Sequence, residues 1–369
     1  MDPSAFYLSL EEPRRSDHLW KYTPWRWVHP TGETGTIPEM GSPHVSLIGI
    51  DGGTAPEGIR VDSGSFSEGE TPEMDCVTDS FLRAISEDSR MVLSVDSGFI
   101  SKDPIVLDIN VGDSMCALHL SLNIGSLAEF ELVTRIRGSG PWFGFLRSGN
   151  IGDGCSINDV CLTLLENGTL LRVDSIGLGR NSNLRAGTIS SGTEKTKADL
   201  RYKMGQEGGN LWVLGSVLSA AKMHIDHHIE IQHEAPETFS RLSWHSACGG
   251  SSRTVGTGML RVMDGAKGAD ADQLFHNLLL SKNAEADSIP ELEVLEHEVV
   301  GCGHGTANGP IDKNQLFYLE SRGLSTKEAR DSLISAFLNA TLSKMGSNEL
   351  HGWLIELLSD ELKTLEGLS

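Results

Sequence analysis

A long series of short apolar segments in residues 91–263 constrains the fold of this chain more than any other feature. Within the segments apolar and polar side chains alternate, and glycine, asparagine or aspartate residues separate one segment from the next. Such alternation is typical of β-strands, because successive side chains of a strand point to opposite faces. No amphipathic helix pattern lies between the segments, which argues against alternating strands and helices. The series predicts a mainly β fold, and a sandwich, a barrel and a solenoid all remain open.

The composition supports β structure and limits the classes of function. The chain has 41 glycines and only 6% aromatic residues, which suits many short strands and turns. Its 51 acidic and 30 basic residues give a formal net charge of −21, which disfavours a sequence-independent nucleic-acid binder. No apolar run of about 18 residues occurs, and the N-terminus lacks the basic-then-apolar order of a secretory signal. We expect a cytoplasmic protein with no membrane or nucleic-acid partner.

The cysteines are scattered and form no CxxC pair, so neither a disulfide framework nor a zinc ribbon is indicated. Most of them are expected to be small buried apolar residues. They are Cys76, Cys116, Cys155, Cys161, Cys248 and Cys302.

The stretch GCGHGTANGP, which begins at Gly301, places a thiol and an imidazole two positions apart. On an extended strand Cys302 and His304 would point to the same face. The glycines beside them leave room for an ion or for another backbone to approach. Two interpretations therefore remain, half of a metal site or a tight crossing of strands.

A histidine-rich stretch, MHIDHHIEIQH in residues 223–233, is a second candidate metal site. On a strand His224, Asp226 and His228 would share one face, and His227 and His233 would lie on the other. Imidazole and carboxylate groups are common transition-metal ligands. The alternative, which we favour, is a solvated polar face on the outside of the fold.

The segments on either side of the strand series have different character. Trp20, Trp25 and Trp27 are too apolar to leave in water, so the N-terminal segment is expected to dock on the body of the protein. Residues 49–87 are rich in glycine, serine and acidic side chains, and we interpret them as a connector with one short helix at residues 81–85.

Helical patterns follow the glycine-rich stretch. Asp312 is a plausible N-cap, Ser325 and Glu328 form a capping box, and a third helix pattern runs from Glu349 to Leu365. These helices carry more apolar surface than a tail of this length can hide. They must therefore dock on the core or on a partner protein.

Common enzyme motifs, such as the phosphate-binding P-loop and the zinc-binding HExxH, are absent from the sequence. Because β-helices also carry polysaccharide lyase sites, a carbohydrate-active enzyme stays open as an alternative. A purely structural interaction protein is the other alternative.

Residues 233–342 closely resemble the SufB/SufD family, the iron-sulfur cluster assembly proteins of the SUF system, and the tryptophan element near residue 20 and the strand-rich middle agree with it loosely. The matching elements, in chain order, are WKYTP from Trp20, HEAPETFS from His233, NLLLS from Asn277, the Cys302-x-His304 pair, QLFYL from Gln315 and SRGL from Ser321. The SufB branch has an H-E-A pattern at the position where this chain has Cys302-Gly303-His304-Gly305, and it carries an extra upstream cysteine motif that this sequence lacks. The resemblance is therefore closer to the SufD branch.

This resemblance implies a right-handed parallel β-helix core in residues 88–305, between an N-terminal segment, residues 1–87, and a C-terminal helical domain, residues 306–369. It also implies a non-catalytic scaffold that pairs with a SufB-type paralogue and binds a SufC-type ATPase, in which the ATPase activity resides. Cys302 and His304 match the motif at the interface where nascent clusters assemble. No tightly bound cofactor is expected, and iron or a transient iron-sulfur cluster would be held at that interface. Whether the second subunit is a paralogue or another copy of this chain stays open.

Overall fold

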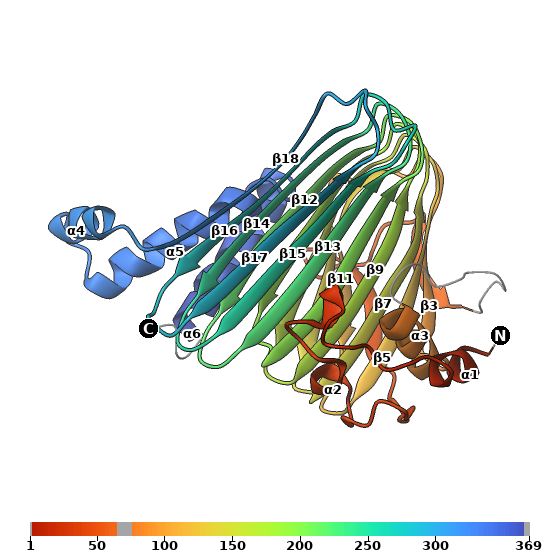
Figure 1. The fold of residues 1–369 in the computed structure, drawn as a ribbon, viewed down its shortest axis with the longest axis horizontal. Helices are drawn as coiled ribbons and strands as arrows, with labels where there is room; N and C mark the ends of the chain where they lie inside the picture. The colour runs from red at the N-terminus through yellow and green to blue at the C-terminus, as the bar shows by residue number, and fades with distance from the viewer. Residues whose placement is uncertain (1, 65–75, 365–369) are drawn as a thin grey trace.

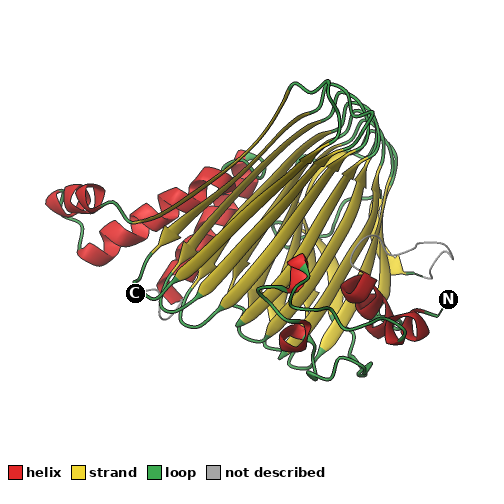
Figure 2. Cartoon of the chain, in the orientation of Figure 1, coloured by secondary structure: helices red, strands yellow, loops and turns green. Residues whose placement is uncertain are grey.

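Two nine-stranded sheets face each other along the length of the molecule, as shown in Figures 1 and 2. The structure is a computed structural model, and it describes residues 2–64 and 76–364. Sheet A consists of β2 (Ile59–Ser63), β3 (Arg90–Val95), β5 (Cys116–Ile124), β7 (Trp142–Ile151), β9 (Thr169–Leu178), β11 (Lys195–Met204), β13 (His224–His233), β15 (Arg253–Val262) and β17 (Glu285–Val294). Sheet B consists of β1 (His44–Gly49), β4 (Ile105–Asn110), β6 (Glu129–Gly138), β8 (Ser156–Leu165), β10 (Asn183–Ser191), β12 (Asn210–Ser219), β14 (Phe239–Cys248), β16 (Asp270–Leu279) and β18 (Gly301–Pro310).

From β3 onward the chain alternates between the two sheets, and each strand pairs in parallel with the strand two positions along the sequence. One strand of each sheet, with the turns that join them, makes one coil of a solenoid. The predicted parallel β-helix core is therefore confirmed, and the sandwich and the barrel are excluded.

A repeated corner joins each strand of sheet A to the next strand of sheet B. One residue per coil adopts a left-handed backbone there, with φ between 51° and 73°. These residues are Gly98, Leu127, Gly154, Asn181, Gly208, Glu237 and Gly268. Each donates its amide to a carbonyl of the following coil, over 2.7 to 3.2 Å. The corner therefore fixes the register of every coil against the next.

The coil is not of constant length, which hides the repeat in the sequence. Side chains that interact between neighbouring coils lie 27 residues apart near Arg180 and Glu207. The separation is 29 residues for Lys197 and Asp226, and 31 for His245 and His276. The sequence therefore has no fixed repeat length, although every coil has the same arrangement of strands and turns.

Inward-facing apolar side chains from both sheets fill the solenoid and form one continuous core. Among the described cysteines, Cys116, Cys155, Cys161 and Cys248 are buried, as predicted. The side chain of Cys76 lies outside the described part of the structure.

A buried ion cluster interrupts this apolar interior. Arg147 lies 2.9 Å from Asp159 and 2.5 Å from Asp174, and Arg172 also lies 2.5 Å from Asp174. Burial alone would raise the pKa of Asp174, but the guanidinium groups of Arg147 and Arg172 outweigh it and hold that pKa well below the usual range. The carboxylate is therefore ionised, and the two charge signs balance within the core.

Helices cover the outer faces of both sheets. On sheet A lie α1 (Pro3–Leu8), η1 (His18–Trp20), α2 (Trp25–Val28) and α3 (Cys76–Ile85), while α5 (Thr326–Leu342) and α6 (Asn348–Thr364) lie on sheet B. Trp20 and Trp25 are buried, which confirms that the N-terminal segment docks on the body of the protein, whereas Trp27 is exposed. The helix predicted at residues 81–85 lies within α3.

Two of the three C-terminal helices dock on the core. α5 and α6 bury an apolar face against sheet B. The helix α4 (Lys313–Ser321) has no buried residue and projects away from the solenoid in Figure 1. The predicted Asp312 cap and the capping box of Ser325 and Glu328 are both present.

Two strands were not predicted from the sequence. β1 and β2 run antiparallel to β4 and β3, and they are the terminal strands of the two sheets at one end of the solenoid. Strand β2 lies inside the segment interpreted as a connector, whose residues 65–75 are outside the described part. Among the described helices, none is long and apolar enough to span a membrane.

Replacing Asp174 by Asn should destabilise the protein strongly, because two buried guanidinium groups would lose their shared carboxylate. Breaking a buried ion pair from one side costs about 3–5 kcal/mol. The free energy of unfolding from urea titrations measures this loss. Glu207→Gln is the control, since its pair with Arg180 is exposed and is worth about 1 kcal/mol or less. Equal small losses in both variants would contradict the role of the cluster.

Candidate functional site

Cys302 and His304 lie on β18, the last strand of sheet B. In register they stand opposite Ala271 and Gln273 of β16, which are both buried. Both side chains therefore share the face that lines the solenoid interior, as expected for residues two apart on a strand. Because no further coil follows β18 in the described chain, this interior face opens at the end of the molecule.

The two candidate ligands differ in environment. Cys302 is partly buried against the apolar core, whereas His304 is exposed. Burial, together with the nearby carboxylate of Asp270, raises the pKa of the Cys302 thiol. In the isolated chain this thiol therefore keeps its proton at neutral pH, and a metal would have to displace it.

The glycines of β18 occupy its outward positions. A Cβ atom at Gly303 would lie 2.9 Å from Oδ1 of Asp272, and one at Gly305 would lie 3.0 Å from Cδ2 of Leu274. Side chains of β16 thus lean over the last strand, and glycine gives them room. Close packing between strands accounts for these two glycines, while the metal role of Cys302 and His304 stays a prediction.

No described residues form a group of three or more His, Cys, Asp or Glu side chains suited to a metal ion. Cys302 and His304 alone provide two ligands, whereas zinc and most iron-sulfur sites use four. A complete site at the end of the solenoid would therefore need ligands from a second molecule.

The outer face of the histidine-rich strand β13 is not solvated, so that interpretation was wrong. The N-terminal segment covers it: Thr23 donates a hydrogen bond to Asp226 and lies 2.8 Å from Nε2 of His224. Because the Thr23 hydroxyl has only one proton, His224 must donate through Nε2. The same carboxylate accepts from Lys197 at 3.1 Å, and the rings of His18 and His228 meet edge to face, with centroids 6.1 Å apart.

The inward-facing histidines of β13 have structural partners. His227 packs against Trp244, with ring centroids 5.0 Å apart. His233 lies 2.8 Å from both Thr238 and Ser240. Since Thr238 donates to a carbonyl, it accepts from Nδ1 of His233, and Nε2 accepts from Ser240. Both nitrogens of His233 are therefore engaged inside the fold.

Sequence reasoning missed two features of the molecule. One is the buried ion cluster, for which the signal is charged residues at inward strand positions, such as Arg147 and Asp174, that recur 27 residues apart. The other is the coverage of β13 by the N-terminal segment, which brings together residues 201 and 203 positions apart. No local pattern signals such a distant contact.

Lowering the pH from about 7 to 5 should lower the free energy of unfolding. Burial lowers the pKa of His227 to about 3 and those of His228 and His233 to about 4. Unfolded histidine titrates near 6.5, so each group destabilises the fold by about 2 kcal/mol at pH 5. The contribution of these neutral histidines to the free energy of unfolding is fully present above about pH 6.5 and is lost as the pH falls towards 4.

Urea titrations at the two pH values check this expectation. His228→Gln should reduce the difference between them by about 2 kcal/mol. A pH dependence that is the same in His228→Gln and in the unaltered protein would contradict the assignment.

The sequence is similar to proteins of a known family. Residues 117–337 match the family model described as SUF system FeS cluster assembly, SufBD core domain. An iron-sulfur cluster assembly SufBD family protein of Mycobacterium leprae is 26% identical over 371 residues, covering 98% of this chain and 93% of the relative. Its counterpart in Mycobacterium tuberculosis is 25% identical over 368 residues, covering 97% and 91%.

A shorter match links the chain to the iron-sulfur cluster assembly protein SufD of Escherichia coli. The two are 40% identical over 85 residues, which are 23% of this chain and 20% of that protein. The family model matches more than half of the chain. The chain therefore belongs to the SufBD family of iron-sulfur cluster assembly proteins of the SUF system.

Proposed function

We propose that this chain is a SufD-like scaffold subunit of the SUF assembly complex. It pairs with a SufB-type paralogue through the open end of the solenoid and binds a SufC-type ATPase through α4. In this role it supports iron acquisition and nascent cluster assembly at Cys302 and His304. The chain itself is non-catalytic, and ATP hydrolysis belongs to the ATPase partner.

The difference between the two ends of the solenoid carries the proposal. At one end the sheets stop at β1 and β2, which have six and five residues and run antiparallel to their neighbours. At the other end they stop at β17 and β18, which have ten residues each and contain no buried residue. A long unpaired edge strand is a template for pairing with another chain, whereas short edge strands discourage it.

The position of the candidate ligands also supports the open end of the solenoid as the pairing surface. Cys302 and His304 open towards the uncovered end and supply half of a four-ligand set. A paralogue that continues the sheets would bring its own inward-facing side chains to this point. Thiolate and neutral imidazole both suit iron, and both must be deprotonated to bind it. A cluster would then form between two subunits rather than on one.

The exposed side chains of helix α4 support the proposed contact with the ATPase. Phe317 is 71% exposed and Tyr318 is 56% exposed, although α5 and α6 bury their apolar faces on sheet B. Exposed aromatic residues on a projecting helix are typical of residues that anchor protein interfaces. The partial similarity to the E. coli protein named SufD favours the SufD branch.

The double variant Phe317→Ala/Tyr318→Ala should lose the ATPase partner and keep the paralogue. Co-expression with a SufB-type protein and a SufC-type ATPase, followed by size exclusion with mass determination, measures both contacts. Trp27→Ala, which removes an aromatic ring that is 52% exposed on the N-terminal segment, is the control. A chain that binds neither protein, or that forms only a homodimer, would contradict the partner assignment.

His304→Ala should lower the iron content and cluster absorbance of the purified complex while the complex still assembles. Cys302→Ala should also lower the iron content and the cluster absorbance, since Cys302 and His304 would both be ligands. His297→Ala, at an exposed histidine in the turn before β18, is the matched control. Unchanged iron in both ligand variants would leave the two residues with a packing role and would refute their assignment as ligands.

A further inference from the structure

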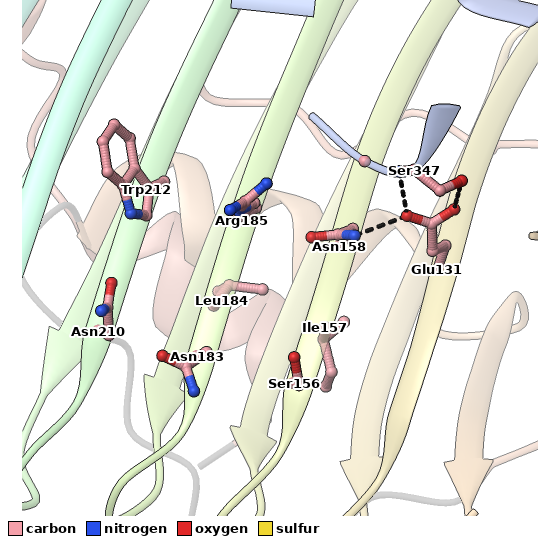
Figure 3. A pocket seen from close by; sticks show the side chains of 11 residues that line it. Glu131, Ser156, Ile157, Asn158, Asn183, Leu184, Arg185, Asn210, Trp212 and Ser347 are labelled. Carbon is pink, nitrogen blue, oxygen red and sulfur yellow. Dashed lines mark hydrogen bonds between the residues drawn. The ribbon is translucent and has the colours of Figure 1, made fainter. Parts of the chain in front are cut away.

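A polar cavity of about 440 Å³ lies on the outer face of sheet B, beside the turn that joins α5 to α6 (Figure 3). This volume falls within the range of about 300–1,000 Å³ that is usual for small-molecule sites. Side chains from β6, β8, β10 and β12 line the cavity, together with Gly346 and Ser347 of the turn. None of the lining residues belongs to β17, β18 or α4.

The in-register coils align the functional groups of the cavity in pairs. Asn183 stands opposite Asn210, and Arg185 stands opposite Trp212. Paired strands lie about 4.7–4.9 Å apart, so two amides, a guanidinium and an indole form one small patch. Figure 3 shows the side chains of these four residues together on two neighbouring strands.

Most of the hydrogen-bonding capacity of this patch is unused. Within the described residues, the side chains of Asn183, Asn210 and Trp212 have no hydrogen-bond partner, and Arg185 makes only one bond, 3.3 Å long, to the carbonyl of Lys344. Each amide offers two N–H donors and an acceptor oxygen, and the indole offers one donor.

The acidic group at the other side of the cavity is already engaged. Glu131 accepts hydrogen bonds from Asn158 and from both the amide and the hydroxyl of Ser347, each over 2.6 Å. The guanidinium of Arg185 is therefore the charged group that remains available to a ligand.

We propose that this cavity binds a small sugar acid, a monocarboxylate whose short carbon chain or ring carries several hydroxyl groups. The planar fork of Arg185 matches a carboxylate. The amides of Asn183 and Asn210 can both donate to and accept from hydroxyl groups, and the apolar ring of Trp212 covers the carbon skeleton. The net charge of −21 works against ligands with several negative charges.

Isothermal titration of the full chain with gluconate and with glucuronate tests this site. Sorbitol, which lacks the carboxylate of gluconate, and hexanoate, which lacks its hydroxyls, are the matched ligands. At least one acid should bind saturably, with an affinity at least about tenfold higher than the affinities of sorbitol and hexanoate. The reason is that a charged hydrogen bond is worth about 1.5–3 kcal/mol. Preference for gluconate would identify an open-chain acid, and preference for glucuronate a ring.

Variants assign the binding to the cavity. Arg185→Gln should lower the affinity for the acid about tenfold or more and leave the affinity for sorbitol unchanged. Asn210→Ala should lower the affinity for both ligands. Arg180→Ala, at an exposed arginine outside the cavity, is the control. The proposal is overturned if neither acid binds saturably, if sorbitol or hexanoate binds equally well, or if Arg185→Gln binds the acid as the unaltered chain does.

Discussion

A ladder of backbone hydrogen bonds along one corner of the solenoid determines most of this structure. Each left-handed corner residue, such as Leu127 or Asn181, donates its amide to the next coil. This bond fixes where each strand of sheet B begins, and a shift of one residue would turn the inward side chains of a strand outward. Because the register holds, Arg147 meets Asp174 inside the solenoid, and Asn183 meets Asn210 outside it.

Coils that stack in register cannot terminate themselves, since every coil presents the same hydrogen-bonding edge as the one before it. At the N-terminal end the chain changes direction into two short antiparallel strands. At the C-terminal end it leaves the solenoid from β18 directly into the projecting helix α4. The incomplete edge, the two candidate ligands and the exposed aromatic residues therefore lie on consecutive parts of the chain. This order is the basis of the proposed assembly role.

Local chemistry made part of the structure predictable. Alternating strands, the Asp312 cap and the capping box at Ser325 each depend on residues close in sequence, and all were predicted correctly. The solvated face expected around Asp226 was wrong, because its cover comes from Thr23, 203 residues away. The sequence shows no strict repeat, since the separation between paired residues of neighbouring coils varies, from 26 for Thr169 and Lys195 to 32 for Arg253 and Glu285. At the candidate site, the spacing of Cys302 and His304 shows their common face but not what lies opposite them.

Hydrogen-deuterium exchange measured on the isolated chain and on its complex with a SufB-type paralogue would test the incomplete edge most directly. We expect the amides of β17 and β18 that point away from β15 and β16 to exchange quickly in the isolated monomer and slowly in the complex, because only a partner can pair the open edge. Amides of β10 and β12, which have neighbours on both sides, should be slow in both states. If the complex forms and the amides of β17 and β18 exchange at the same rate as in the monomer, the solenoid end is not the pairing surface.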